Sequence, residues 1–284
     1  MNKAKQIQWF PGHMFKSLRE IKEKINLMDL VLVLLDSRLP DSSMNPELLK
    51  IVGHKPIILL FNKMDLADQF HLNRWMKYYE EKGYYTLKID AQSGKNVQRI
   101  HKLSEEVLKD KIDRARQKGL KQRAFRTMII GVPNVGKSTL INRLAQKKAA
   151  KTANTPGVTK AQQWIKLSDQ FELLDTPGVL WPKFDDQKIG YHLAITGAIK
   201  DSILPDYDLF VYAIDFLSEN YQKRLEERYG ALGTSISEWF EIIASKRGAY
   251  LKEKEIDETR VIQVLLHDIR NNHLGGLTFD RLDV

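Results

Sequence analysis

The stretch Gly131-Val132-Pro133-Asn134-Val135-Gly136-Lys137-Ser138-Thr139 decides the fold of this 284-residue chain. It fits the pattern G-x-x-x-x-G-K-[ST], the phosphate-binding P-loop. A mostly apolar run from Thr127 to Ile130 precedes it and predicts a buried strand, and residues 140–145 follow with apolar side chains at helical spacing. Because strand, glycine loop and helix form the context that the motif requires, we interpret the stretch as a phosphate cradle and not as a plain glycine turn.

The chemistry of a P-loop gives its residues separate roles. Backbone N–H groups at the start of a helix can surround phosphates, where the helix dipole favours negative charge. Lys137 can reach the β- and γ-phosphates, and Ser138 can place its hydroxyl on Mg²⁺. The predicted phosphate-binding residues are Gly131, Asn134, Val135, Gly136, Lys137, Ser138 and Thr139, together with Gly178 farther along the chain. The loop alone does not say which nucleotide it holds.

Composition limits the class of protein. With 43% hydrophobic and 29% charged residues, the chain has the make-up of a globular protein and the length for two domains. The absence of cysteine excludes disulfides, Cys-type zinc fingers and cysteine nucleophiles. The net charge of +9 favours a polyanionic partner such as nucleic acid, only slightly ahead of a surface that simply carries extra lysines.

Neither a membrane span nor a secretion signal is apparent. No apolar run is long enough to cross a bilayer, and residues 1–8 lack the apolar core of a secretion signal. We therefore expect a cytoplasmic protein with no membrane partner.

Apolar runs alternate with helical patterns over the first part of the chain. The runs at residues 30–35 and 56–61 read as buried strands, residues 84–89 as a third strand, and residues 161–167 and 170–174 as a hairpin. This alternation predicts an α/β fold, a mostly parallel sheet with helices on both faces. Pro11-Gly12 predicts a turn, and the basic stretch 109–126 predicts a helix end followed by a linker.

The character of the sequence changes after about Pro182. Amphipathic helices are expected at residues 206–217, 237–246 and 258–269, with Ser235 and Glu238 at capping-box spacing. We predict a P-loop domain over residues 1–182 and a basic, all-α, RNA-binding domain over residues 183–284. Its basic residues include Arg224, Arg228, Lys246, Arg247, Arg260 and Arg270.

The sequence Asn62-Lys63-Met64-Asp65 is N-K-x-D, and it follows a predicted strand, at the end where open α/β sheets bind ligands. Asp65 can accept hydrogen bonds from the N1–H and the exocyclic amine of guanine, a donor pair that adenine lacks. Asn62 can bind the other edge of the base and brace the P-loop, and the stem of Lys63 can lie along the base plane. The predicted guanine-binding residues are Asn62, Lys63, Met64, Asp65, Asp90 and Ala91, the last through its N–H.

The sequence Asp175-Thr176-Pro177-Gly178 is D-x-x-G at the end of the last predicted strand. Asp175 can hold Mg²⁺ through water, and the Gly178 N–H can sense a γ-phosphate. Thr155 and Thr159 can each offer a hydroxyl to the metal, and we favour Thr159. The predicted magnesium ligands are thus Ser138, Thr159 and Asp175.

These motifs resemble those of translation-factor-related GTPases, but in permuted order. N-K-x-D and the loop Asp90–Gly94 here precede the P-loop, whereas they usually follow D-x-x-G. The chain therefore resembles the circularly permuted GTPases. A permutation is tolerated because the termini of compact domains lie close together, and residues 109–125 are the candidate join. The new end falls after D-x-x-G, so movement of that segment leads directly into the helical domain.

Within that group the chain resembles the bacterial ribosome biogenesis GTPase A (YlqF-type) family. The similarity spans essentially the whole chain and rests on Trp9–Met14, the P-loop, Asp175–Pro182 and Ala194–Ile199. It implies hydrolysis of GTP to GDP and phosphate, slow alone and stimulated by the ribosomal subunit. It further implies binding to rRNA of the large (50S) subunit in the GTP state, release on hydrolysis, and a C-terminal domain that contacts RNA. We expect a monomer. The departure from the family pattern is Asp90, where Ser is usual.

Two further residues carry mechanistic expectations. Val179 stands where many GTPases place the glutamine that orients the attacking water. The resemblance implies that His13 takes this catalytic role, although it could equally be a packed or surface histidine. It also suggests that Asn134 helps to hold K⁺, against the simpler reading of a loop residue that tolerates the turn.

Two alternative functions remain open at this point. The first is a GTPase that acts on the small ribosomal subunit, although the barrel or zinc module usual in such proteins is not evident. The second is a P-loop kinase for a small molecule, against which the N-K-x-D sequence argues.

Overall fold

The computed structural model describes residues 12–119, 123–145, 163–169, 171–181, 184, 186–200 and 203–282, apart from the side chain of His13. Its centre is a six-stranded sheet in the order β3-β2-β1-β4-β6-β5. The strands are β1 (Leu30–Asp36), β2 (Ile57–Asn62), β3 (Tyr85–Lys88), β4 (Phe125–Gly131), β5 (Gln163–Ser168) and β6 (Phe171–Asp175). All neighbours pair in parallel except β5, which forms the expected antiparallel hairpin with β6. The predicted α/β class is confirmed.

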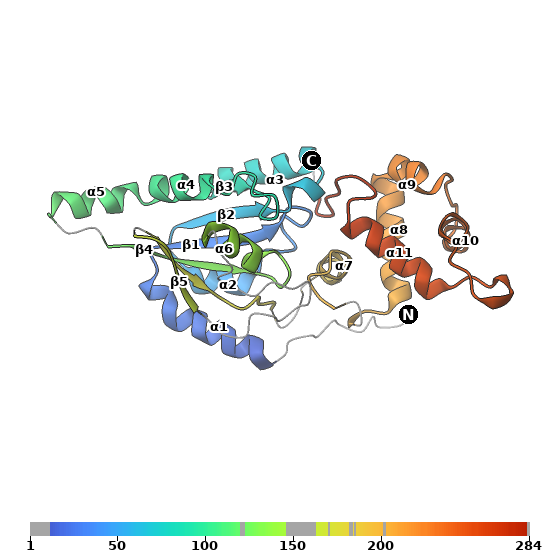
Figure 1. Cartoon of the computed structure of the whole chain (residues 1–284), viewed down its shortest axis with the longest axis horizontal. Helices are drawn as coiled ribbons and strands as arrows, with labels where there is room; N and C mark the ends of the chain where they lie inside the picture. Colours follow the sequence, from blue (N-terminus) through green and yellow to red (C-terminus); the bar gives the residue numbers. More distant parts are fainter. Residues whose placement is uncertain are drawn as a thin grey trace.

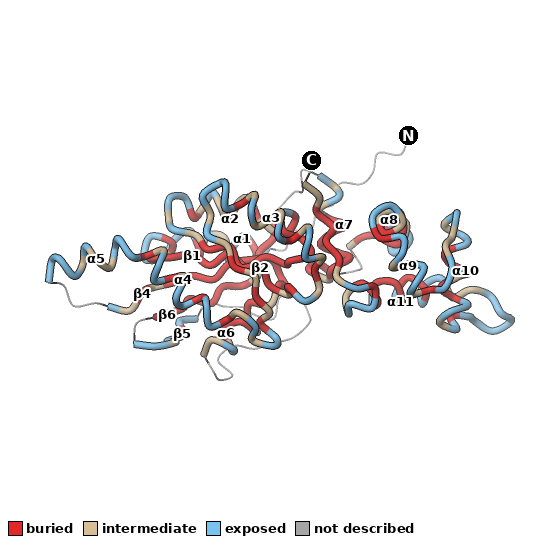
Figure 2. Tube along the Cα trace, turned by 90° about the horizontal axis from the view of Figure 1, so that it is seen from above, coloured by how far each residue is buried: buried red, intermediate tan, exposed pale blue. Residues whose placement is uncertain are grey.

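Helices cover both faces of this sheet (Figure 2). One face carries α1 (Gly12–Lys24), α2 (Pro46–Val52) and α3 (Gln69–Glu81), and the other carries α4 (Arg99–Val107) and α6 (Lys137–Ala145). Because both faces are covered, β1 buries every one of its residues, which explains its unbroken apolar sequence. The helix α2 begins at Pro46, and the Asn45 side chain caps it by accepting from the N–H groups of Glu47 and Leu48.

The C-terminal part of the chain, from residue 186 to residue 270, is helical and lies at one end of the sheet (Figure 1); we call it the helical half. It contains α7 (Gln187–Ile195), α8 (Asp206–Asn220), α9 (Gln222–Tyr229), α10 (Ile236–Arg247) and α11 (Glu258–Arg270). The helix α10 begins at the predicted capping box, where the Ser235 side chain accepts from the N–H of Glu238. Two helices were not predicted. Of these, α7 buries most of its residues and therefore shows no polar face, and α9 is short and highly charged. Within the described residues, no helix is long and apolar enough to span a bilayer.

One local prediction was wrong, and a second was confirmed only in part. Gly12 is the first residue of α1 and not part of a turn, whereas Pro11 lies outside the described residues. The basic stretch after α4 is also more ordered than a linker. Its first part forms α5 (Lys109–Gln117), which buries none of its residues and projects away from the sheet (Figure 1), and its last residues belong to β4.

The buried carboxylate of Asp29 anchors this joining segment to the start of β1. Its oxygens accept from the Arg123 guanidinium at 2.8 and 2.9 Å, from the Arg126 N–H at 2.9 Å, and from the Lys111 ammonium. Burial acts to raise the pKa of Asp29, but these donors outweigh it and the pKa is lowered. One carboxylate therefore holds both ends of the segment that joins the two permuted parts of the domain.

Replacing Asp29 by Asn should reduce the free energy of unfolding by about 1–3 kcal/mol at pH 7, because two cations and an N–H lose a charged acceptor. The pKa of Asp29 is lower in the folded than in the unfolded protein. Its carboxylate therefore stabilises the fold fully at pH values above the pKa that Asp29 has in the unfolded chain, and this stabilisation is lost as the pH falls through the pKa that Asp29 has in the folded protein. Urea unfolding of D29N and wild type should therefore differ by a constant amount between about pH 5 and 7 and converge below about pH 4. D169N, in the exposed turn between β5 and β6, is the control with little expected change; a D29N curve that matches it would contradict the anchor.

Candidate nucleotide site at the carboxyl edge of the sheet

The register of the parallel strands brings the predicted motifs to one edge. Asp36 at the end of β1 lies opposite Asn62 at the end of β2, and Asp175 at the end of β6 lies opposite Ile129 of β4. The strand β4 runs directly into the P-loop. Because parallel strands end on the same side, motifs that are far apart in the sequence meet here.

Close approaches explain the glycines of the P-loop. A Cβ on Gly136 would lie 2.4 Å from Nδ2 of Asn62, and its φ of +102° is unfavourable for other residues. A Cβ on Gly178 would lie 2.7 Å from Cα of Pro133 and 3.1 Å from Nζ of Lys137. The D-x-x-G segment therefore lies flat against the P-loop, beside its lysine.

Lys137 and Asp175 form the charged centre of the site. The buried Lys137 ammonium donates to the carbonyl oxygens of Gly131 and Val132, both at 3.0 Å. Burial lowers the pKa of Lys137 and raises the pKa of Asp175, and attraction between the two groups opposes both shifts.

The carboxylate of Asp175 suits a divalent cation. Asp175 is fully buried, and neither of its oxygens has a hydrogen-bond partner among the described residues. A buried carboxylate without donors is costly unless something positive satisfies it, and hard cations such as Mg²⁺ prefer oxygen ligands. Ser138 lies half-buried in the first turn of α6, whereas Thr155 and Thr159 lie outside the described residues.

Asn62 connects the guanine motif to two other segments. Its Nδ2 donates to the Val135 carbonyl of the P-loop at 2.8 Å, and its Oδ1 accepts from the Ala91 N–H at 2.9 Å. The Ala91 N–H, which we expect to contact guanine O6, thus has Asn62 as its partner here. Asp65 lies at the same edge with its side chain exposed on one side. Neighbouring atoms shield its carboxyl from part of the solvent, and this partial desolvation, together with the negative charge of the nearby Asp90, raises its pKa.

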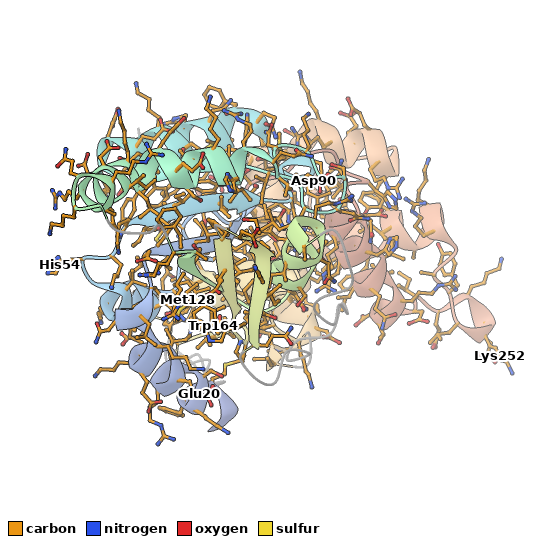
Figure 3. The ribbon with its side chains drawn as sticks, turned by 60° about the vertical axis from the view of Figure 1, so that its left-hand side comes forward. Glu20, His54, Asp90, Met128, Trp164 and Lys252 are labelled. Carbon is orange, nitrogen blue, oxygen red and sulfur yellow. The ribbon has the colours of Figure 1, made fainter. Side chains whose placement is uncertain are left out.

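The loop after β3 is stabilised by Asp90, one of its own residues, and by Arg143 of α6. Asp90, labelled in Figure 3, accepts from the N–H groups of Gln92 at 2.8 Å and Ser93 at 3.2 Å, so it supports the turn where the family usually has Ser. Arg143 of α6 donates to the carbonyl oxygens of Ala91, at 3.4 Å, and of Gln92. Sequence reasoning missed Arg143, because its position on a helix gives no sign of the loop that it reaches.

A second missed group lies at the end of β1. The buried Asp36 accepts from the Arg38 guanidinium at 2.9 and 2.7 Å and from Nζ of Lys63 at 2.9 Å. Burial acts to raise the pKa of Asp36, but Arg38 and Lys63 outweigh it and lower the pKa. The side chain of Lys63, a residue with a left-handed φ of +58°, is therefore held in place by Asp36 within the guanine motif. An acidic residue at the end of a buried strand, on the ligand-binding edge, was the available signal.

Val179 is buried, so its apolar side chain is packed inside the protein. Its N–H donates to the Gly131 carbonyl at 3.2 Å, and its carbonyl accepts from Asn45 at 3.0 Å. His13 lies in the first turn of α1, but its side chain, like residues 9–11, lies outside what the structure describes. Asn134 has a left-handed φ of +55° and donates from Nδ2 to the Gly197 carbonyl at 2.8 Å, so its side chain connects the P-loop to the residues after α7.

Most of the arginines expected to contact RNA have internal partners. Arg228 and Arg247 pair with Asp268 at 2.7 and 3.2 Å, and Arg270 donates to the Ala194 carbonyl at 2.7 Å. Arg224 donates to the Gly276 carbonyl. The exposed basic residues of the helical half include Lys246, Arg260, Lys252 and Lys254, and Lys252 lies at its outer tip (Figure 3).

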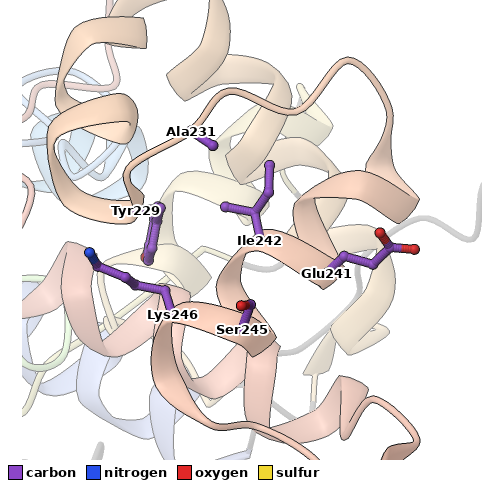
Figure 4. A pocket seen from close by; sticks show the side chains of 6 residues that line it. All are labelled: Tyr229, Ala231, Glu241, Ile242, Ser245 and Lys246. Carbon is purple, nitrogen blue, oxygen red and sulfur yellow. The ribbon is translucent and has the colours of Figure 1, made fainter.

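A pocket of about 450 Å³ lies elsewhere, between the end of α9 and α10 (Figure 4). It is lined by Tyr229, Ala231, Glu241, Ile242, Ser245 and Lys246. None of the predicted nucleotide-binding residues contributes to it, so it is separate from the site at the sheet edge.

A P-loop followed by D-x-x-G, with N-K-x-D from earlier in the chain beside them at one sheet edge, defines a circularly permuted P-loop GTPase. Comparison with known proteins is more specific. Over 277 residues the chain is 51% identical to ribosome biogenesis GTPase A of Priestia megaterium, with 96% of each chain covered. It is 48% identical to the protein of that name from Bacillus pumilus, covering 97% of this chain and 98% of the relative. The chain belongs to the ribosome biogenesis GTPase A family.

Family models and solved structures agree with this assignment. A model described as 50S ribosome-binding GTPase matches residues 126–245, and one described as RsgA GTPase matches residues 47–185. The crystal structure of GNP-bound YlqF from T. maritima is similar with a TM-score of 0.68 and 25% sequence identity, covering 94% of this chain and 98% of that one. GDP-bound YlqF from that source gives a TM-score of 0.67 with 26% identity, covering 93% and 99%. The protein is therefore a GTP-binding hydrolase of ribosome biogenesis, with the permuted fold predicted from its motif order.

Replacing Gly136 by Ala should weaken GDP binding about 30-fold or more, equivalent to roughly 2 kcal/mol. The new methyl would displace the Asn62 side chain and break its hydrogen bonds to the P-loop and to Ala91. Fluorescent GDP titration measures the loss. The matched control is G83A, which also adds a methyl at a left-handed glycine but meets no atom within 4 Å. Equal affinities in G136A and G83A would show that the close packing does not matter.

Proposed function

We propose that this GTPase assists assembly of the large ribosomal subunit, binding the precursor in its GTP state and leaving after hydrolysis. The observation that most supports this is the direct contact between the phosphate loop and the helical half, the Asn134–Gly197 hydrogen bond of 2.8 Å. Only a short segment separates D-x-x-G from α7. A change at the γ-phosphate could thus alter the placement of the helical half. The description of the matching family model, 50S ribosome-binding GTPase, favours the large subunit as partner.

In this proposal each motif performs a separate task. Asp65 and Asn62 select guanine, while Lys63 and Met64 flank the base and Lys137 and the loop N–H groups hold the phosphates. Mg²⁺, held by Ser138, Asp175 and Thr159, would neutralise charge that develops on the phosphates when it is bound. A K⁺ ion at Asn134 would add to that charge.

Hydrolysis is expected to be slow in the isolated protein. Val179 is apolar and buried, so it cannot orient the attacking water. We propose that His13, at the start of α1, does so when the protein is bound to the ribosomal subunit. The subunit would then stimulate hydrolysis by placing the His13 side chain next to the attacking water, so that GTP is hydrolysed mainly when the protein is bound to the subunit.

We further propose that residues 1–182 act as the GTPase unit and residues 183–284 as the RNA-contacting unit of a monomer. Since Arg224, Arg228, Arg247 and Arg270 are used internally, the exposed lysines around the outer tip of the helical half are the better candidates for phosphate contacts. Bacterial ribosomes are assembled in the cytoplasm, which is where we expect the protein to act.

Co-sedimentation with separated ribosomal subunits tests the proposed partner. The full-length protein should pellet with the large subunit in the presence of a non-hydrolysable GTP analogue, much less with GDP, and less as salt rises because phosphate contacts release counterions. Binding confined to the small subunit, or independent of the nucleotide, would overturn the proposal.

Replacing His13 by Ala should lower subunit-stimulated GTP turnover about 100-fold, a typical contribution of a positioned acid–base group, and leave GTP affinity nearly unchanged. Single-turnover hydrolysis with large subunits and a fluorescent GTP titration measure the two quantities. H54A is the control, because His54 is exposed in the turn after α2. If H13A and H54A turn over GTP equally fast, His13 is not the catalytic group.

A further inference from the structure

The last described segment of the chain, residues 274–282, leaves the helical half and packs on the GTPase unit; we name it the C-terminal strap. Its first contacts are with the two residues that follow the guanine motif in the sequence. The Leu277 N–H donates to the Leu66 carbonyl at 2.9 Å. A Cβ on Gly276 would lie 2.4 Å from the Ala67 carbonyl oxygen and 2.7 Å from its carbon, so the two backbones touch. Leu66 and Ala67 immediately follow Asp65.

The strap then fixes the loop that follows β1. The Phe279 N–H donates to the Arg38 carbonyl at 2.8 Å. The buried Asp280 accepts through Oδ2 from the N–H groups of Asp41 and Ser42, both at 2.7 Å, and its Oδ1 accepts from Ser42 and lies 2.9 Å from Nδ1 of His192. The strap is therefore held by buried polar bonds, and one of them reaches α7 of the helical half.

These two sets of contacts reach the guanine motif by separate routes. Arg38, whose carbonyl the strap binds, is also the residue whose guanidinium holds Asp36, and Asp36 holds Lys63. The Arg38 guanidinium additionally donates to the Thr196 carbonyl, after α7, at 3.4 Å. Lys63 is thus supported through Arg38, and the backbone after Asp65 is supported through Leu277.

We propose that the C-terminal strap is a positioning element of the guanine site, so that docking of the helical half and binding of the base strengthen each other. The proposal rests on guanine being bound by Asn62–Asp65, as in the proposed function. Coupling of this kind is reciprocal: a strap that favours the binding-competent loop is itself stabilised by the bound base.

The position of the strap sets the nucleotide dependence of this coupling. Its contacts are with the base end of the site, and none of those described involves Lys137, Gly178 or Asp175. GDP and GTP carry the same base, so the strap strengthens the binding of both nucleotides equally. The D-x-x-G segment, beside Lys137, is instead where the two nucleotides differ.

Replacing Gly276 by Ala in the full-length protein tests the proposal, since the methyl forces the strap away from Ala67. Fluorescent GDP and a fluorescent non-hydrolysable GTP analogue should both bind about 5-fold or more weakly, within the usual range of coupling between sites, and by the same factor. The KM for GTP should rise by that factor while kcat stays the same. Hydrogen exchange on wild-type protein should show the Leu277 and Phe279 amides equally protected by GDP and by the GTP analogue.

The control is again G83A, whose methyl meets no neighbour and which should keep wild-type affinity. D280N, which weakens the strap without adding bulk, should move affinity in the same direction as G276A and guards against misfolding of one variant. Wild-type affinity in folded G276A and D280N, or a loss restricted to the GTP analogue, would overturn the proposal. Failure of the wild-type protein to bind guanine nucleotides at all would instead remove the proposed function on which it rests.

Discussion

The side-chain amide of Asn62 is the interaction on which the site depends. Its two hydrogen bonds reach across 73 positions to Val135 and across 29 positions to Ala91, and so tie the guanine motif to the P-loop and to the loop after β3. Both bonds are buried, where an unpaired amide would be costly. They also impose the glycine at position 136, because no other residue leaves room for the amide.

This constraint explains why the order of the motifs can change without loss of the site. Asn62 requires that Val135 and Ala91 lie nearby in space, and the parallel register of β1, β2 and β4 provides that whichever segment comes first in the chain. The permutation adds a new connection between the two segments that form the termini of the domain in the usual motif order. Here that connection is α5, and the electrostatic anchor at Asp29 holds it to the sheet.

The parts that could be predicted from sequence are those with a strong local signal. Unbroken apolar runs located the strands, and the glycine pattern and N-K-x-D located the nucleotide motifs. The full extent of α5 was not predicted because none of its residues is fully buried, and α7 was not predicted because most of its residues are buried, so neither shows a clear contrast between two faces. The reach of Arg143 to the loop after β3 and the pairing of Lys63 with Asp36 are tertiary contacts that no local pattern reports. Arginines of the helical half looked like an RNA surface, although burial of Asp268 turned two of them into structural ion-pair partners.

The exposed helix α5 has a consequence for how this family can vary. None of its residues is fully buried, and Ile112 packs only partly against the core, so substitutions at its exposed positions cost little stability. Selection for a folded protein therefore acts on the Lys111 and Arg123 contacts with Asp29, while the rest of the helix is left open to drift or to a new role. The exposed positions of α5, the helix that joins the two permuted parts of the domain, are thus free to acquire features that distinguish one lineage from another.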